Sequence, residues 1–406
     1  STDTHAGADL RDYKPYLESR WHEDFDAWAQ TFDDPWDRYR VDGLKETAEE
    51  KGTHANWDSD LRVKTLEAEG VAAEVLYPNT IPPFFPTTGI LIPQPKTQLE
   101  YDQRWAGLRA HNRWQLDFCS QVPGRRLGLA QIFLNNVDDA VAEARWAREN
   151  GFVGLLAPSV SPDHPTVRGI WKEEYEPLWS VCEELELTVN QHAGSGAPDF
   201  DLEDPADRAI SLYEIPFFSH RSLWHLILGG VFERHPRLRV AFTEEGAKWI
   251  PETLQTLDAI VHRFRWPGST ASSFGGDAAA KLSLLPSEYF HRQCGLATFL
   301  TRADVEARDT IGVPNLMWAT DYPHQESTVP NSLAAMRKAF VGVPEAETRE
   351  MLGMNAVRFY GLDEALLAEV AQRIGPSPAE VDTPLEQPPA NPRTCPVFRD
   401  ADYVGA

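Results

Sequence analysis

The chain has 406 residues, of which 42% are hydrophobic and 25% are charged. This is an ordinary globular composition, and the length allows one large α/β barrel or two to three smaller domains. Lys and Arg number 38 against 62 Asp and Glu, so the formal net charge is −24. Because nucleic acids and anionic membrane surfaces repel a surface of this sign, we expect neither as a partner.

The four cysteines lie far apart and form no C-x-x-C pair. They therefore indicate neither a disulfide scaffold nor a cysteine zinc site. No apolar stretch approaches the roughly 20 residues that a membrane helix needs, and no basic leader precedes an apolar run. We expect a soluble, cytoplasmic protein. Residues 1–5 have the pattern of the end of a strand, which indicates a native chain that begins upstream.

Short β-branched runs alternate with segments of helical periodicity from about residue 58 to 340, which is typical of repeated β-α units. In chain order, strands are predicted at 1–5, 73–78, 127–133, 153–157, 187–192, 238–244, 295–299 and 316–321. Helices are predicted at 58–69, 100–121, 138–150, 172–185, 219–233, 248–265, 302–311 and 332–341. Eight strands alternating with eight helices favour an α/β fold, a distorted (β/α)8 TIM barrel, over an open sheet.

Two insertions and a C-terminal extension fall outside the repeated units. Residues 12–57 are rich in Trp, Asp and Glu and are predicted to be an insertion after the first strand. The apolar, proline-rich residues 79–99 are predicted to be either a loop packed on the barrel rim or a lid over the substrate. We therefore expect a metal-dependent barrel domain over residues 1–361. Residues 362–406 are expected to form a C-terminal helix and a proline-rich tail.

Potential metal ligands end several predicted strands, at the end of a barrel where its chemistry gathers. Asp3 and His5 end the first strand, and their D-x-H spacing places both on one face of an extended chain. His192 ends the fifth strand, Glu244 the sixth and Asp321 the eighth. Such ligands suit a divalent zinc, iron or manganese ion, one or two per chain. Taken singly, His192 and Asp321 are equally well explained as buried polar side chains satisfied by their neighbours, whereas the strand ends taken together favour the metal site.

The order of these residues resembles the amidohydrolase superfamily, in the branch similar to aminocarboxymuconate-semialdehyde decarboxylase and gamma-resorcylate decarboxylase. The most specific motif is WATDYPH at 318–324, and GGVFERHP at 229–236 and GAKWIP at 246–251 are also similar to that branch. The resemblance extends from the first strand to about Gly361. It implies a metal at the mouth of the barrel, with Asp321 as ligand and general base, and a homo-oligomer.

Glu244 departs from that branch, because the decarboxylases place a ligand or active-site histidine at the end of the sixth strand. A carboxylate there adds negative charge, which should retain a divalent ion and weaken the attraction for a substrate carboxylate. This favours a metal-dependent hydrolase of an amide, ester, lactone or thioester. The alternative is a non-oxidative decarboxylase of an aromatic or unsaturated carboxylic acid, with Glu244 orienting His192 or His5 from outside the ligand set. A third interpretation is a catalytically inactive barrel used for binding.

In the hydrolase, Asp321 would take the proton of the metal-activated water, and His220 or His324 would donate to the developing oxyanion. The alternatives are a capping or solvated His220 and a His324 that braces Asp321. Lys248 and Arg292 could neutralise an anionic substrate group, although each is more often a surface charge. The expected substrate is a small molecule with an apolar or aromatic part, because aromatic side chains are predicted to line the pocket: Trp28, Trp36, Trp57, Trp249 and residues 82–85.

Overall fold

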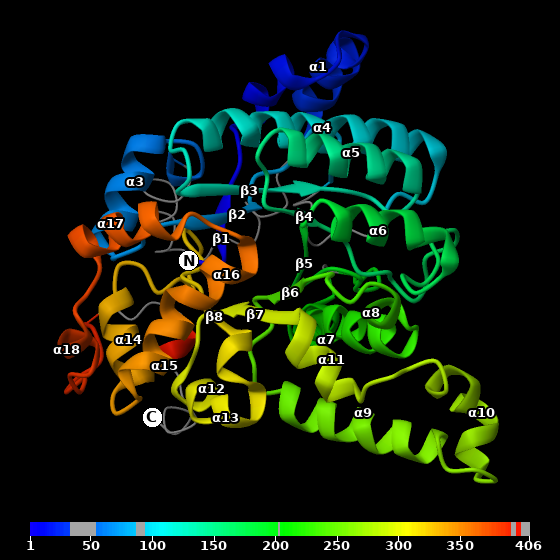
Figure 1. The fold of residues 1–406 in the computed structure, drawn as a ribbon. Coiled ribbons are helices and arrows are strands. Elements are labelled where there is room, and N and C mark those ends of the chain that lie inside the picture. The colour runs from blue at the N-terminus through cyan, green and yellow to red at the C-terminus, as the bar shows by residue number, and fades with distance from the viewer. Residues whose placement is uncertain (33–53, 87–93, 202–203, 391–394, 399–406) are drawn as a thin grey trace.

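The centre of the molecule is an eight-stranded parallel sheet in which each strand pairs with the next along the chain. The computed structural model describes residues 1–32, 54–86, 94–201, 204–390 and 395–398. Its strands are β1 (Thr4–Ala6), β2 (Glu74–Pro78), β3 (Arg126–Gln131), β4 (Gly154–Leu156), β5 (Thr188–His192), β6 (Val240–Thr243), β7 (Cys294–Thr298) and β8 (Leu316–Trp318). Tyr322, after β8, pairs with Thr4 in a parallel bridge, so the last strand returns to the first. The predicted distorted (β/α)8 TIM barrel is confirmed (Figure 1).

Helices surround the strands and follow the predicted alternation. They are α1 (His22–Thr31), α3 (Ser59–Ala68), α4 (Gln98–Ser120), α5 (Val137–Glu149), α6 (Glu176–Glu184), α7 (Pro205–Leu228), α8 (Val231–Arg234), α9 (Ile250–Phe264), α10 (Thr270–Ala279), α11 (Pro286–Gln293), α12 (Arg302–Glu306), α13 (Arg308–Ile311), α14 (Ser332–Phe340), α15 (Glu345–Arg349), α16 (Asn355–Tyr360), α17 (Glu364–Ile374) and α18 (Pro378–Val381). Short 3-10 or π turns are η1 (Leu10–Tyr16), η2 (Ser19–Trp21), η4 (His54–Asn56), η5 (Glu173–Tyr175), η6 (Val313–Asn315), η7 (Glu350–Met354) and η8 (Pro396–Phe398).

Several helical regions differ from the predicted elements, among them α1, α15 and α16, which lie outside the predicted helices. Helix α7 begins at Pro205 rather than at residue 219, because the Asp204 side chain accepts hydrogen bonds from the first backbone amides and a proline occupies the first turn. Helices α10 and α11 lie where no element was predicted. The α10 sequence TASSFGGDAA is rich in glycine and serine, which weakens the helical signal.

The extension after residue 361 begins with α17 and α18, and its described end packs on the barrel. Val397 and Phe398 of η8 are 0% and 2% exposed and belong to the same hydrophobic cluster as α14. The division of the chain at residue 361 stays a prediction. Among the residues that the structure describes, no helix combines the length and the apolar character needed to cross a membrane.

A buried ionic triad joins the first three strands. Arg62 Nη2 lies 2.6 Å from Glu74 Oε2, and Arg126 Nε donates to Glu74 Oε1 at 3.0 Å. Burial alone would raise the pKa of Glu74, but the two guanidinium groups outweigh burial and lower it. Arg62 Nη1 also donates to the backbone carbonyl of His5 at 2.7 Å. Through this hydrogen bond the triad stabilises β1 at His5, the residue whose side chain faces the candidate site.

Gly107 lets α4 lie directly against the loop that follows β2. A Cβ atom added at Gly107 would lie 2.0 Å from the carbonyl oxygen of Pro83. We expect Gly107→Ala to lower the free energy of unfolding by about 1–3 kcal/mol, although alanine is the better helix former. Urea denaturation measures the change. Gly353→Ala is the matched control, because no atom lies within 4 Å of its added Cβ; equal stabilities for the two variants would contradict the prediction.

Candidate metal centre

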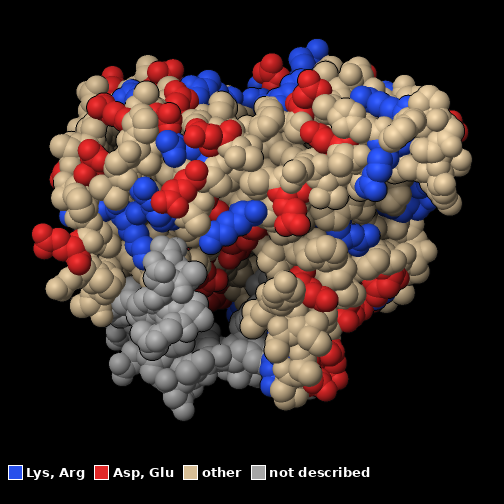
Figure 2. Space-filling view, turned by 90° about the horizontal axis from the view of Figure 1, so that it is seen from below, with Lys and Arg blue, Asp and Glu red and all other residues tan. Residues whose placement is uncertain are grey.

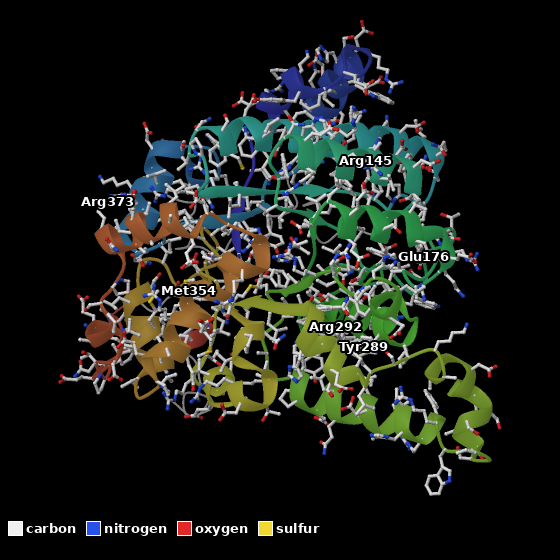
Figure 3. All side chains as sticks on the ribbon, viewed as in Figure 1. Arg145, Glu176, Tyr289, Arg292, Met354 and Arg373 are labelled. Atoms are coloured by element: carbon white, nitrogen blue, oxygen red, sulfur yellow. The ribbon has the colours of Figure 1, made fainter. Side chains whose placement is uncertain are left out.

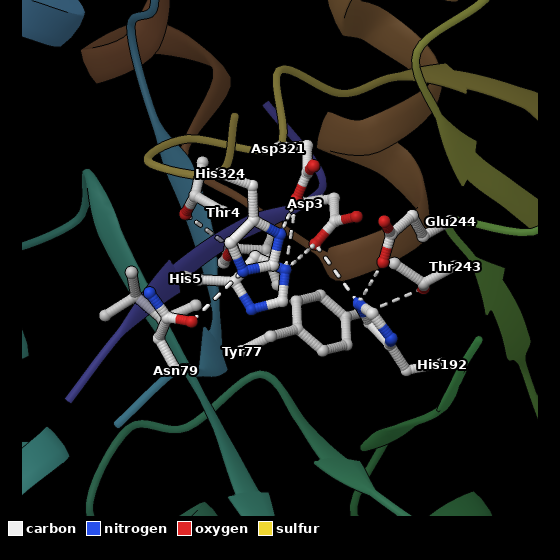
Figure 4. A network of polar contacts seen from close by, with 12 residues as sticks. Asp3, Thr4, His5, Tyr77, Asn79, His192, Thr243, Glu244, Asp321 and His324 are labelled. Carbon is white, nitrogen blue, oxygen red and sulfur yellow. Dashed lines mark hydrogen bonds and ion pairs between the residues drawn. The ribbon is translucent and has the colours of Figure 1, made fainter. Parts of the chain in front are cut away.

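Four strands deliver side chains to one point at the carboxyl end of the barrel (Figure 4). His5 Nε2 lies 3.4 Å from Asp3 Oδ1 and 3.2 Å from Asp321 Oδ1. His192 Nε2 lies 3.8 Å from Asp3 Oδ1 and 3.3 Å from Glu244 Oε2. The ligand atoms of Asp3, His5, His192 and Glu244 all lie within 4.8 Å of one another. The structure thus brings together the five residues that the sequence places at strand ends.

Glu244 and Asp321 leave their strands in a left-handed backbone conformation, with φ angles of 58° and 57°. This conformation is uncommon outside glycine and costs of order 1–3 kcal/mol. Glu244 directly follows β6, which therefore ends at Thr243, one residue before the predicted end, while β8 ends at Trp318, three residues before Asp321. The two turns direct the carboxylates toward the imidazoles of His192 and His5.

The hydrogen bonds of His5 and His192 fix which ring nitrogen is free. His5 Nδ1 lies 3.0 Å from the carbonyl oxygen of Pro78, and His192 Nδ1 lies 2.9 Å from that of Ala193. Because a carbonyl oxygen only accepts, each Nδ1 carries the proton and donates it. Both Nε2 atoms therefore present a lone pair to the centre, which is the arrangement of metal-binding histidines.

The ligand atoms are buried and lack ordinary partners. Nε2 of both histidines and both carboxylate oxygens of Asp3 and Asp321 have no hydrogen bond. Burying such acceptors without a partner is costly, and these six atoms around one point fit a divalent cation. Burial and the carboxylates of Asp321 and Asp3 raise the pKa of Glu244. Burial alone would lower the pKa of His5, but Asp3 and Asp321 raise it, so the centre attracts positive charge.

His324 lies beside this cluster and braces Asp321. Its Nδ1 is 2.9 Å from Asp321 Oδ1, its Nε2 is 3.0 Å from Asn79 Oδ1, and its ring stacks on that of His5 with centroids 3.9 Å apart. His5, Glu244, Asp321 and His324 form a second group of ligand atoms within 4.8 Å of one another. The structure thus contains the contact with Asp321 that the bracing alternative for His324 predicts.

The sequence analysis did not identify Tyr77 and Asn79 as residues of the site; Tyr77 lies near the end of β2 and Asn79 directly follows it. The Tyr77 ring lies beside those of His5 and His192, with centroids 5.9 and 5.0 Å away, and its hydroxyl is 2.7 Å from Thr243 Oγ1. Asn79 contacts His324. Alternation along β2 was the available signal, because Val75 and Tyr77 share the inward face.

His220 lies apart from both groups of ligand atoms among the described residues. Its Nε2 is 3.5 Å from Glu245 Oε2, and its ring stacks on Trp249 with centroids 3.9 Å apart. Burial lowers the pKa of His220 to about 4 and raises that of Glu245. His220 is therefore a buried imidazole packed on the residues after β6, rather than a capping or solvated one, and its role toward substrate stays a prediction.

The two cations considered as substrate partners do not reach the cluster. Lys248 is exposed. Arg292 lies on α11 beside Tyr289 and donates to the carbonyl of Phe232 (Figure 3). Because α11 precedes β7, Arg292 stands at the amino end of the barrel, opposite the candidate centre. Lys248 and Arg292 are therefore both surface charges, as the alternative interpretation predicted.

The predicted aromatic wall is described only in part. Trp28 of α1 packs on Phe84 of the loop after β2, with ring centroids 5.7 Å apart. Trp57 packs partly buried on the cluster beside β1. Trp36 lies outside the described residues. The insertion after β1 and the loop after β2 therefore pack on each other through aromatic side chains.

The sequence profile of the amidohydrolase family matches residues 52–362. The chain belongs to the amidohydrolase family. This amidohydrolase is 25% identical over 319 residues to 2-amino-3-carboxymuconate-6-semialdehyde decarboxylase of Dictyostelium discoideum, covering 76% of this chain and 77% of the relative. The crystal structure of 5-carboxyvanillate decarboxylase from Sphingomonas paucimobilis is similar with a TM-score of 0.62 and 21% identity, over 89% of this chain and 98% of the other. The expected branch of the superfamily is confirmed.

A further solved structure similar to this amidohydrolase is a dihydroxybenzoic acid decarboxylase from Polaromonas sp. JS666 with bound manganese. It aligns with a TM-score of 0.57 and 17% identity, over 89% of this chain and 96% of the other. These relatives are named decarboxylases, so the expectation of a hydrolase is wrong. The error has a physical reason, since the charge of one residue at the centre, Glu244, does not determine which substrate bond breaks.

Proposed function

We propose that this amidohydrolase is a divalent-metal-dependent, non-oxidative decarboxylase of a small aromatic or unsaturated carboxylic acid. The observation that carries the proposal is the group of six buried, unpartnered ligand atoms at the strand ends. The printed names of the curated relative and of the structural neighbours support the choice of reaction. We place the whole reaction in the barrel domain, residues 1–361.

We assign the ion to Asp3, His5, His192 and Asp321, with Glu244 as a further oxygen donor next to His192. His5 belongs to both groups of ligand atoms, and its Nδ1 is engaged with Pro78, so we assign a single ion, bound at His5 Nε2. Manganese is the first ion to test, because carboxylate donors suit it and the Polaromonas decarboxylase holds it. When bound, the ion would neutralise substrate oxygen atoms and stabilise negative charge there.

The reaction needs a proton donor of this chain. The bond from the carboxylate carbon to the ring or chain carbon breaks, its electron pair stays on that carbon, carbon dioxide leaves, and the carbon takes a proton. His324 Nε2 donates to Asn79 Oδ1, and His324 Nδ1 lies 2.9 Å from Asp321 Oδ1, close enough for a proton to pass between these two atoms. Asp321 is 0% exposed, which keeps bulk water from this proton. We assign delivery of the proton to Asp321 and its placement to His324.

Metal replacement tests the proposal. The protein is stripped with a chelator, reloaded with Mn²⁺, and offered aromatic and unsaturated carboxylic acids while released carbon dioxide is measured. We expect release only by the reloaded protein, and about one ion per chain by elemental analysis. The same samples are offered esters, amides and thioesters. Hydrolysis of these without release of carbon dioxide, or activity that is independent of metal, would contradict the proposal.

A further inference from the structure

A network of uncharged polar side chains lies inside the barrel, next to the candidate metal centre. The Tyr77 ring contacts the rings of His5 and His192 (Figure 4). At the other end of this side chain, the Tyr77 hydroxyl lies 2.7 Å from Thr243 Oγ1 and donates to Asn190 Oδ1 at 3.3 Å. Tyr77, Thr243 and Asn190 are all 0% exposed. The hydroxyl therefore joins β2 to β5 and β6, two strands that lead to residues of the metal centre.

Asn190 is the shared partner in this network. Its Nδ2 donates to the carbonyl oxygen of Leu155 at 3.2 Å and to Thr188 Oγ1 at 2.9 Å. These two bonds fix the orientation of the amide, so Oδ1 faces the Tyr77 side as an acceptor with two lone pairs. Gly154 leaves room for the amide, because a Cβ atom added there would lie 2.7 Å from Asn190 Nδ2. Asn190 stands on the same face of β5 as the ligand two residues later.

The second hydroxyl on Asn190 comes from outside the strands. Tyr360 ends α16, which packs beside β8 (Figure 1), and its hydroxyl donates to Asn190 Oδ1 at 2.9 Å. Tyr360 is 4% exposed and belongs to the same hydrophobic cluster as Val75 and Tyr77. At the start of α16, Asn355 Nδ2 donates to the carbonyl of Leu316, where β8 begins. Tyr360 therefore enters the barrel from its amino end, opposite the metal centre.

The network carries no formal charge. The outer surface differs, because acidic and basic side chains are spread over the face drawn in Figure 2. The metal centre differs too, since Asp3, Glu244 and Asp321 are carboxylates. A tyrosine-to-phenylalanine change in the network thus leaves the charge around the ion unchanged. Any change in metal binding that follows from it reports a change in the position of the ligands.

We propose that Tyr360 is a positioning residue of the metal centre: by sharing Asn190 Oδ1 with Tyr77, it holds the Tyr77 ring against the two histidine ligands. Without the Tyr360 hydroxyl, a buried acceptor is half satisfied, and Asn190 and Tyr77 shift to compensate. His5 and His192 are oriented by one backbone hydrogen bond at each Nδ1 and by ring contacts, so the shift turns their Nε2 atoms. The inference rests on the metal assignment of the proposed function, but not on the reaction.

Calorimetric titration of the chelator-stripped chain with Mn²⁺ tests the proposal. Removing a direct partner of a ligand typically weakens metal binding about 10–100-fold, and Tyr360 lies farther out, so we expect Tyr360→Phe to weaken it about three- to tenfold. The visible spectrum of the Co²⁺-loaded chain reports the geometry of the ligands, and it is expected to differ between Tyr360→Phe and the parent. Unchanged affinity and an unchanged spectrum would overturn the proposal.

Tyr289→Phe is the matched control. Tyr289 lies on α11 and is 0% exposed, and its hydroxyl contacts Glu233 and the backbone amide of Ser283. The variant therefore also loses a buried phenol hydroxyl, but away from Asn190. It should change neither the affinity for Mn²⁺ nor the Co²⁺ spectrum. An equal weakening in Tyr289→Phe and Tyr360→Phe would overturn the proposal, because the loss would then reflect a general effect on stability.

A double variant tests the route through Tyr77. Tyr77→Phe removes the other hydroxyl on Asn190 Oδ1 and should itself weaken Mn²⁺ binding. Because Tyr360 acts through Tyr77, adding Tyr360→Phe to Tyr77→Phe should cause little further loss, whereas losses that add would overturn the proposal. These titrations need no substrate. A parent chain that binds Mn²⁺ but releases no carbon dioxide would contradict the proposed function alone.

Discussion

Replacing Asp321 by asparagine is expected to lower the rate of decarboxylation by about 10²–10⁴-fold. The change keeps the shape of the side chain but removes its charge and its capacity to exchange a proton with His324. Asp321 is also an assigned ligand, with Oδ1 3.2 Å from His5 Nε2, so we expect weaker metal binding as well. Initial rates at saturating Mn²⁺, with the metal content of each sample measured, separate the two effects.

The control for Asp321→Asn is Asp309→Asn, which makes the same chemical change at an exposed position on α13. It should leave rate and metal content unchanged. Asn79→Ala is expected to lower kcat to a smaller extent without changing metal content, because Asn79 contacts His324 and Asn56 but is not one of the assigned ligands. A rate for Asp321→Asn within a few-fold of the parent, at equal metal content, would remove Asp321 from the proposed proton transfer.

Replacing Glu74 by alanine is expected to lower the free energy of unfolding by about 3–5 kcal/mol. Glu74 is 4% exposed and joins two guanidinium groups, so its loss leaves Arg62 and Arg126 buried without a counter-charge. Because Arg62 also donates to the carbonyl of His5, we expect the variant to bind Mn²⁺ more weakly in the temperature range where it is folded. Urea denaturation and metal titration provide the two measurements.

The matched control for Glu74→Ala is Glu306→Ala, which also breaks an ion pair with an arginine, Arg302. This pair lies on the surface, since the Glu306 side chain is 61% exposed. That pair should contribute less than about 1 kcal/mol. Similar losses of stability in the two variants would show that the triad is solvated rather than buried. An unchanged affinity for Mn²⁺ in Glu74→Ala would show that Arg62 does not position β1.

The strands and most of the centre could be predicted because both depend on local pattern. Short β-branched runs end in Asp, His or Glu, and in a parallel barrel all such ends meet at one mouth. His192 illustrates this, since it ends β5 and lies in the cluster. Glu244 and Asp321 lie at the mouth of the barrel as predicted, but β6 and β8 stop earlier than predicted. The left-handed backbone at these two non-glycine residues has no sequence signal.

The remaining features depend on contacts between distant segments. Glu74 lies at the start of a predicted strand, where the sequence alone gives no sign of its partners. Only the packing of α3 and β3 places Arg62 and Arg126 beside it. Asn79 contacts His324 across 245 positions of sequence. The first half of α7 was missed because its apolar residues face outward. For the reaction, the favoured hydrolase was wrong and the names of the relatives support the alternative, a decarboxylase, because residue types at a metal centre define the ligands, while the substrate bond that breaks depends on the rest of the pocket.

The left-handed turns at Glu244 and Asp321 are held in place by neighbouring segments of the barrel. Each turn is anchored by its own amide, since Glu244 N donates to Ala297 O and Asp321 N donates to Asp3 O, both at 2.9 Å. Neighbouring strands thus maintain a conformation that a free chain avoids. The barrel itself therefore fixes the backbone that positions both carboxylates of the candidate centre.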